Sequence, residues 1–163
     1  MLEDGSVYEG TARGDFKETA CEIVFNTSMT GYVEILTDPS YAGQGVVMTY
    51  PMIGNYGISR EDFESERLQP SAFIVHELSS DPANFRCTDT IENLLKEYNI
   101  PCISGVDTRA VVKKLRESGT MRGVLTSDIG DRERLMDVIK SFRQIDLVGS
   151  VTAKQTKVYG EEN

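Results

Sequence analysis

The sequence contains a single histidine and only three cysteines among its 163 residues. Cys21, Cys87 and Cys102 lie far apart, and no two of them form a Cys-x-x-Cys pair. Protein zinc sites draw on cysteine and histidine at close spacing, so this composition excludes the usual zinc sites, and we predict no metal site. The odd number and wide spacing of the cysteines also indicate reduced thiols rather than a disulfide framework.

Positive charge and long apolar runs are scarce as well. The chain has 17 Lys and Arg against 26 Asp and Glu, a formal net charge of −9. Nucleic acids and anionic membranes bind surfaces with a surplus of Lys and Arg, so we expect neither as a partner. No apolar run approaches the roughly 20 residues that span a bilayer. The N-terminus has neither a basic start nor an apolar core, and we predict a cytoplasmic location.

The usual set of catalytic groups is also missing. His76, the only histidine, lies in the apolar run 72–78, where a histidine is more often structural than catalytic. Neither Cys21 nor Cys102 lies in a sharp strand-to-helix turn of the kind that presents a nucleophile. We therefore predict no catalytic residue in this chain. Pairing of Cys102 or Cys21 with His76, as in a small free-standing hydrolase, stays open as the alternative function.

The stretch 26–41 carries the most information about function. It follows the apolar run 23–25 and places hydroxyl and amide side chains around Met29 before a second apolar pair, Ile35 and Leu36. One interpretation is structural: two strands are joined by a loop whose hydroxyls bond stray backbone groups. The other is functional: the loop presents hydroxyls and backbone N–H groups to something outside the domain. The pattern alone does not decide between them.

Apolar periodicity predicts a mixed α+β fold. Strand-like runs crowd the first half, whereas helices alternate with strands in the second half. We expect a three-layer sheet/sheet/helix domain, with one helix layer on one side of a central sheet. Asp89, Asp107 and Asp131 are the expected N-caps of three helices. The expected strands are 19–25, 45–50, 72–78, 101–106 and 123–126, with a hairpin at 2–10 and a polar connection at 11–16.

The segment 53–57 is a loop punctuated by glycine. Gly54 and Gly57 fit a tight turn that needs positive φ. The loop lacks the Lys and the Ser or Thr of a phosphate-binding loop. A nucleotide-binding module built on this loop is therefore a third and weaker hypothesis.

Several motifs stand in the order found in one enzyme family. They are Asn26-Thr-Ser-Met-Thr-Gly-Tyr32, Leu36-Thr-Asp-Pro-Ser-Tyr41, Gln44, Thr49-Tyr-Pro-Met-Ile-Gly-Asn-Tyr-Gly57 and Asp107-Thr-Arg109. From about Leu2 onward, the chain resembles the amino-terminal domain of the small subunit of glutamine-dependent carbamoyl-phosphate synthetase. One departure is Val33, where the family often has Gln. The resemblance implies the same three-layer fold.

The resemblance also implies a role in a larger enzyme. The family's small subunit has a second part, a class I glutamine amidotransferase domain with a Cys-His-Glu triad, which this resemblance does not cover. We expect residues 1–145 to form the amino-terminal domain and 146–163 to be a linker toward that glutaminase domain. In the family, ammonia from glutamine passes to a large subunit, which makes carbamoyl phosphate for arginine and pyrimidine synthesis. That subunit uses bicarbonate, ATP and Mg²⁺, and we expect no cofactor in this chain.

The resemblance assigns site residues too. Ser40, in the Asp-Pro-Ser-Tyr motif, corresponds to a serine that hydrogen-bonds glutamine in the family. A hydroxyl suits an amino acid because it can donate to the carboxylate and accept from the ammonium. The structural alternative is a turn serine that bonds its own backbone. We expect the domain to dock on the large subunit and to border the glutaminase site. The interface candidates are Asn26, Thr27, Ser28, Met29, Thr30, Gly31, Tyr32, Asp107 and Arg109.

Overall fold

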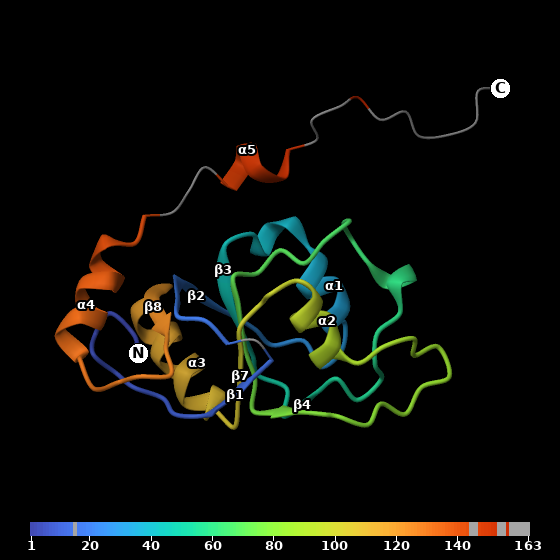
Figure 1. The fold of residues 1–163 in the computed structure, drawn as a ribbon, viewed down its shortest axis with the longest axis horizontal. Coiled ribbons are helices and arrows are strands. Elements are labelled where there is room, and N and C mark those ends of the chain that lie inside the picture. The colour runs from blue at the N-terminus through green and yellow to red at the C-terminus, as the bar shows by residue number, and fades with distance from the viewer. Residues whose placement is uncertain (15, 144–146, 153–155, 157–163) are drawn as a thin grey trace.

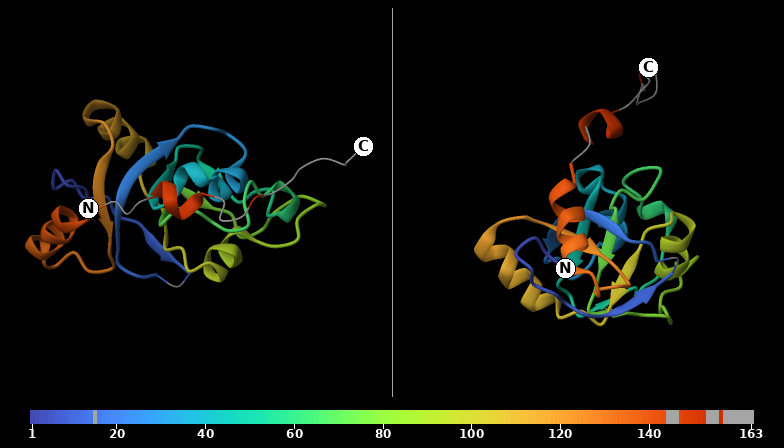
Figure 2. Two further views of the ribbon diagram at one scale, coloured as in Figure 1. Left: turned by 90° about the horizontal axis from the view of Figure 1, so that it is seen from above. Right: turned by 60° about the vertical axis from the view of Figure 1, so that its left-hand side comes forward.

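The computed structural model describes residues 1–14, 16–143, 147–152 and 156. The strands are β1 (Thr11–Arg13), β2 (Thr19–Asn26), β3 (Gln44–Met48), β4 (Met52–Ile53), β5 (Ala72–Ile74), β6 (Glu77–Leu78), β7 (Cys102–Ser104) and β8 (Met121–Leu125). The helices are α1 (Tyr32–Thr37), α2 (Ile91–Glu97), α3 (Thr108–Ser118), α4 (Arg132–Ser141) and α5 (Leu147–Val151), with 3-10 turns η1 (Pro39–Tyr41) and η2 (Arg60–Asp62). Figure 1 and Figure 2 show the helices arranged around the strands.

Four neighbouring strands of the larger sheet run parallel. This six-stranded sheet has the order β1-β7-β5-β3-β2-β8, and β4 and β6 form a separate pair. β2 pairs with β3, β3 with β5, and β5 with β7 in parallel, whereas β8 and β1 are antiparallel edge strands. Because the four parallel strands share one direction, the segments that follow their carboxyl ends meet at one edge of the sheet.

Both faces of the large sheet are covered. On β3, Val46 and Met48 pack with α1 and α2, whereas Val47 packs with α3, because successive side chains of a strand point to opposite faces. The mixed α+β fold with two sheets is confirmed. Its helices lie on both faces rather than in the single expected layer. The reason is connectivity: α1 and α2 belong to crossovers between parallel strands, whereas α3 leads to the antiparallel edge strand β8.

The amino ends of α3 and α4 are as predicted. Asp107 and Asp131 each accept a hydrogen bond from the amide three residues on, at 3.0 and 2.9 Å. The cap of α2 is Thr90 instead of Asp89, because the Thr90 hydroxyl accepts from the Asn93 amide at 3.2 Å. Asp89 supports this cap by accepting from the Thr90 amide at 2.7 Å. The predicted cap was wrong by one position, because Asp89 and Thr90 both have side chains that can cap a helix.

Ile35 and Leu36 lie in helix α1 and not in the strand that the structural interpretation assumed. Tyr32, Ile35 and Leu36 are spaced by three and four residues, and all three are buried. The helix begins after Gly31, whose φ of +81° is left-handed. The β-branched residues of this short segment favour a strand by propensity, and burial of one helical face overrides that preference.

The N-terminal segment makes the expected tight turn without forming a hairpin. Gly5 has φ +84°, and the Leu2 amide donates to the Ser6 carbonyl at 2.8 Å. Leu2 then bridges antiparallel to Gly123 in β8, so its partner is a strand far away in the sequence. Residues 11–13, predicted as a polar connection, form β1 beside β7. Their side chains are all exposed, so no apolar alternation revealed this strand.

The predicted strand 72–78 is divided between the two sheets. β5 ends at Ile74, and the backbone then changes partners: the Val75 amide donates to Ile103, whereas the Glu77 amide donates to Pro51. An unbroken apolar run does not show where a strand leaves one sheet for another. The strands predicted at 19–25, 45–50, 101–106 and 123–126 correspond to β2, β3, β7 and β8.

The predicted linker, 146–163, lies largely outside the described residues. The described part of it includes α5, a short helix over Leu147–Val151. The division of the chain into a domain and a linker stays a prediction.

Candidate functional site

Four segments meet where the parallel strands end. Asn26 is the last residue of β2, Thr49 follows β3, His76 lies just after β5, and Asp107 lies just after β7. The Thr49 amide donates to the Asn26 carbonyl at 3.1 Å, which joins the first two segments directly. Likewise, the Gly105 amide donates to the His76 carbonyl at 2.7 Å. We call residues 26–31, 49–51, 76 and 105–109 the carboxyl edge. In sheets with parallel strands, ligands bind at this edge.

Two hollows open on the carboxyl edge, and they share Thr49 and Arg109. The larger has a volume of about 380 Å³ and is lined by Thr27, Thr49, Arg109, Val112, Lys113, Arg116 and Glu117. The smaller has a volume of about 250 Å³ and is lined by Thr49, Pro51, His76, Asp107, Thr108 and Arg109. The edge therefore offers polar and charged groups from α3 and from the segments that follow β2, β3 and β5.

The structure brings together interface candidates from distant parts of the sequence. Thr27, Asp107 and Arg109 all line these hollows. His76 and Lys113 line them too, and sequence reasoning missed both as site residues. His76 lies just after strand β5, and Lys113 lies on the helix that follows strand β7. Such positions indicate a ligand-binding site only when the strands are known to run parallel, and the sequence does not show which strands do so.

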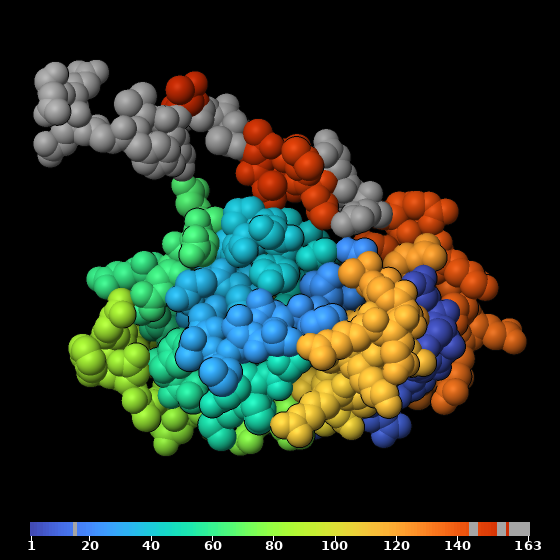
Figure 3. Space-filling view, turned by 180° about the vertical axis from the view of Figure 1, so that it is seen from behind, coloured from blue at the N-terminus to red at the C-terminus, as the bar shows by residue number. Residues whose placement is uncertain are grey.

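The loop formed by residues 27–30 is exposed, and Met29 has 71% of its surface accessible. Figure 3 shows this blue segment beside the gold helix α3 on one face of the molecule. Asn26 anchors the base of the loop, because its side-chain amide donates to the Tyr41 hydroxyl at 2.9 Å. Tyr41 is the neighbour of Ser40, so this bond connects the loop to the predicted glutamine-binding segment.

Tyr32 differs from the other interface candidates because its side chain is only 1% exposed. Its hydroxyl donates to the Gly57 carbonyl at 2.7 Å, and its ring stacks on Tyr56 with centroids 4.2 Å apart. The Tyr56 hydroxyl accepts from the amides of Gly31 and Tyr32 at 2.7 and 3.1 Å. Burial raises the pKa of Tyr32, so its hydroxyl stays a donor. Tyr32 therefore anchors the loop from within the core rather than presenting its ring at the surface.

Ser40 lies in the 3-10 turn η1 and is exposed. Its amide donates to the Asp38 carboxylate at 2.8 Å. Within the described residues its hydroxyl makes no hydrogen bond, so it does not bond its own backbone as the structural alternative assumed. Leu147 of α5 lies beside Gly43, three residues further along the chain, since a Cβ added at Gly43 would come within 2.9 Å of it. The Ser40 hydroxyl is thus exposed but does not line the two hollows of the carboxyl edge.

Asp107 and Arg109 do not pair with each other. The Asp107 carboxylate accepts from the Ala110 amide as the cap of α3. Arg109 is exposed in the first turn of the same helix, where the helix dipole disfavours a positive charge. No carboxylate in the described part of the chain forms an ion pair with Arg109. Its guanidinium is therefore free to meet a group outside the domain.

The cysteines and His76 do not form a catalytic pair. Cys21 and Cys102 are each fully buried in a core cluster. Burial raises the pKa of both thiols to about 12, which suppresses the reactive thiolate at neutral pH. His76 is exposed, and its Nδ1 lies 3.1 Å from the Val106 carbonyl oxygen. This arrangement argues against the free-standing hydrolase.

The glycines of the segment 53–57 have a structural use. Gly54 and Gly57 have φ of +93° and +69°, and the Gly57 amide donates to the Gly54 carbonyl at 3.1 Å. A Cβ at Gly57 would clash with the Cys87 sulfur. The loop does not open a helix that would direct backbone N–H groups at a phosphate. The nucleotide-binding hypothesis gains no support.

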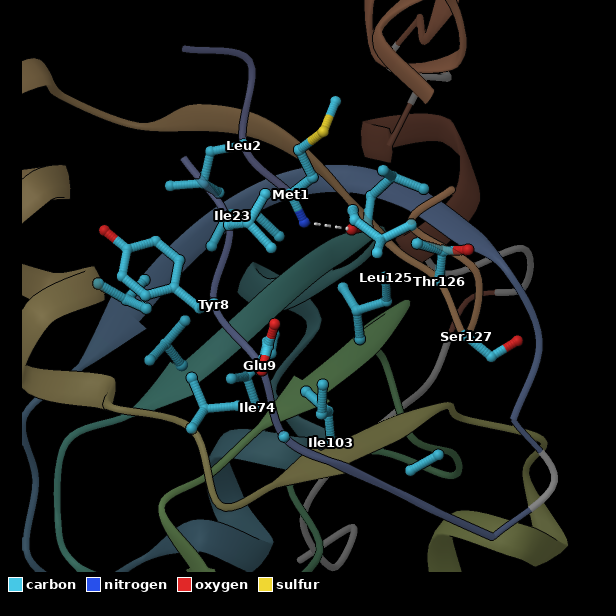
Figure 4. A pocket seen from close by; sticks show the side chains of 18 of the residues that line it. Met1, Leu2, Tyr8, Glu9, Ile23, Ile74, Ile103, Leu125, Thr126 and Ser127 are labelled. Atoms are coloured by element: carbon cyan, nitrogen blue, oxygen red, sulfur yellow. Dashed lines mark hydrogen bonds between the residues drawn. The ribbon is translucent and has the colours of Figure 1, made fainter. Parts of the chain in front are cut away.

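A further hollow of about 410 Å³ lies beneath the N-terminal segment and involves none of the predicted site residues. Figure 4 shows aliphatic side chains such as Ile23, Ile74 and Ile103 lining it. At its rim the Met1 ammonium donates to the Val124 carbonyl at 2.9 Å, and burial lowers its pKa. The lining is largely apolar, with Tyr8, Glu9, Thr126 and Ser127 as polar members, and it contains none of the residues that the family resemblance assigns, so this hollow is not the candidate site for glutamine.

The described residues form neither a metal centre nor a membrane-spanning helix. They contain no group of three or more His, Cys, Asp or Glu side chains that could hold a metal ion. No helix among them has the length and apolar character needed to cross a bilayer.

Comparison with known proteins identifies the family. Residues 1–125 match the family described as carbamoyl-phosphate synthase small chain, CPSase domain. The chain is 54% identical to the carbamoyl phosphate synthase small chain of Fusobacterium nucleatum, over 94% of this chain and 43% of that protein. It is 49% identical to the small chain of Archaeoglobus fulgidus, over 96% of this chain and 44% of that protein. It thus spans less than half of these relatives' length. The chain belongs to the carbamoyl-phosphate synthase small chain family, through that family's CPSase domain.

Proposed function

We propose that this chain is the domain that docks a small chain on the large synthetase chain and borders the site of glutamine hydrolysis. Its other partner is the glutaminase domain of the small chain. Ammonia released from glutamine there is used by the large chain, with bicarbonate, ATP and Mg²⁺, to make carbamoyl phosphate for arginine and pyrimidine synthesis in the cytoplasm. The domain itself holds no cofactor in this proposal.

The observation that carries the proposal is the bond between Asn26 and Tyr41. At 2.9 Å, it joins the exposed loop 27–30 to the turn that presents the Ser40 hydroxyl. The exposed Ser40 hydroxyl is available for a polar substrate, and the loop with its exposed Met29 is available for a protein partner. Methionine is enriched in protein interfaces, and surrounding hydroxyls supply directional hydrogen bonds.

The proposal gives this domain a binding role and leaves the chemistry to other parts. An exposed serine hydroxyl such as that of Ser40 can hydrogen-bond the ammonium or carboxylate of glutamine. Hydrolysis of the side-chain amide needs an activated nucleophile. Cys21 and Cys102 are both buried with raised pKa values, and neither meets that need. Substrate positioning without catalysis is the function that these groups support.

The purified 163-residue chain is therefore expected to bind the large synthetase chain but to release no ammonia from glutamine. Binding is measured by sedimentation velocity with the purified large chain, and ammonia release by a coupled assay against a buffer blank. Ammonia release that disappears in Cys102→Ala or Cys21→Ala would favour the hydrolase. Absence of binding at micromolar concentrations of both chains would contradict the docking role.

A further inference from the structure

Only some of the cations in the described part of this acidic chain form ion pairs. Ion pairs with carboxylates are formed by Arg60, Arg86, Lys96, Lys114, Arg122 and Arg134. Arg109 and Lys113 form none within the described residues, although the chain carries a net charge of −9. Their positive charge is thus not neutralised by this part of the molecule, and both stand on α3 above the larger hollow of the carboxyl edge.

Arg109, Lys113 and Arg116 form one row along α3, because residues spaced by three and four lie on the same face of a helix. We call these three residues the basic row. Arg116 is held with its guanidinium 5.6 Å from the centre of the Phe25 ring. Across the hollow stands Thr27, at the start of the exposed loop. The row and the loop therefore form one surface, which Figure 3 shows as adjoining gold and blue segments.

The rim of the hollow contains one acid, Glu117, against the three cations of the basic row. A net positive surface on a negatively charged molecule selects for a negatively charged partner and steers its approach. Lys113 and Arg109 are exposed, so water and salt would screen their attraction for a small free ion. A protein surface that also covers Met29 would exclude that water and strengthen the same attraction.

We propose that the basic row docks a carboxylate-rich segment of the large synthetase chain. The proposal rests on the proposed function, since it names the chemistry of the surface that this domain meets. The acidic segment lies along α3, with its carboxylates opposite Arg109 and Lys113, and the loop 27–30 closes one end of the contact. Association then depends on ionic strength, because part of the binding comes from attraction between opposite charges.

The test uses the full small chain and the large chain, with affinity measured at low and high salt. The double variant Arg109→Glu and Lys113→Glu is compared with the matched variant Arg132→Glu and Lys140→Glu on α4. Arg132 and Lys140 are also exposed and form no ion pair within the described residues. Both variants place one glutamate in the first turn of a helix, where the dipole favours it, and both add the same negative charge. Lys140→Glu also places a glutamate in the last turn of α4, where the dipole opposes it, so circular dichroism of the α4 variant checks that the helix still forms.

The α3 variant is expected to weaken association at low salt by at least about tenfold and to lose most of its salt dependence. The α4 variant is expected to bind within about twofold of the unmodified chain. Equal binding by both variants and the unmodified chain would overturn this inference while leaving docking intact. Inorganic phosphate binding that is lost only in the α3 variant, with unchanged association, would assign the row to a small anion instead. If the unmodified small chain does not bind the large chain, the docking role in the proposed function is contradicted, and this inference is contradicted with it.

Discussion

Ser40→Ala in a full small chain is expected to weaken the use of glutamine by roughly tenfold to a hundredfold. One hydrogen bond to a charged group contributes about 1.5–3 kcal/mol, which corresponds to that change in affinity. Ser40 is exposed, and within the described residues its hydroxyl has no other hydrogen bond, so little is lost from the fold itself. The measurement is the KM for glutamine in carbamoyl phosphate synthesis by the assembled enzyme.

Synthesis from added ammonia is the internal control, because ammonia bypasses glutamine binding. It is expected to stay near normal in Ser40→Ala. Ser127→Ala removes another exposed serine hydroxyl, far along the sequence in the loop after β8, and is expected to affect neither nitrogen source. If Ser40→Ala lowers synthesis from both sources equally, Ser40 supports the structure of the turn and does not contact glutamine.

Gly57→Ala is expected to lower the free energy of unfolding by about 2–5 kcal/mol. A left-handed φ of +69° costs an alanine about 1–2 kcal/mol. Overlap with the packed neighbour Cys87, whose Cβ would lie 2.8 Å from the new methyl carbon, adds about 1–3 kcal/mol. The free energy of unfolding is obtained from urea denaturation of the chain, followed by circular dichroism.

Gly5→Ala is the matched control because Gly5 has a similar φ of +84° and nothing lies within 4 Å of its added Cβ. Gly5→Ala is expected to lower the free energy of unfolding only by the cost of placing an alanine at a left-handed φ, about 1–2 kcal/mol. The difference between the two variants isolates the close packing of the segment 53–57 against Cys87. Equal destabilisation by both variants would contradict that packing and would reopen a binding role for the glycine loop.

Much of the fold was predictable from local chemistry. The α3 helix was predicted from an aspartate cap, three inward-facing apolar residues and a closing glycine, and the structure has Asp107, Gly119 and the buried residues in those places. Strands β2, β3, β7 and β8 were predictable because a short apolar run in the sequence is typical of a buried strand. The elements that the sequence did not predict depend on contacts between residues far apart in the chain. Strand β1 forms because Thr11–Arg13 pairs with β7, and its side chains are all exposed, so no apolar pattern indicates it.

The site was only partly predictable, and its two halves differ. Ser40 and the loop 26–32 were found through a family motif, whereas no local pattern places His76 or Lys113 at the two hollows of the carboxyl edge. Their proximity depends on the parallel order of four strands, and a sequence does not specify strand direction locally. Tyr32 is a residue that the sequence assigned to the interface and the structure places in the core. Its residue type favours an interface, but its hydroxyl reaches Gly57 and its ring completes the core.

In the proposed function, the carboxyl edge faces the rest of the enzyme. Hydrogen exchange of the small chain, measured free and in complex with the large chain, tests this claim most directly. We expect exchange to slow markedly across residues 27–30 and the first turn of α3 on assembly. The charged segment 60–67 should exchange at nearly the same rate in both states. Equal exchange across 27–30 in the free and assembled states would mean that the loop only completes the fold, and would contradict the placement of the carboxyl edge at an interface.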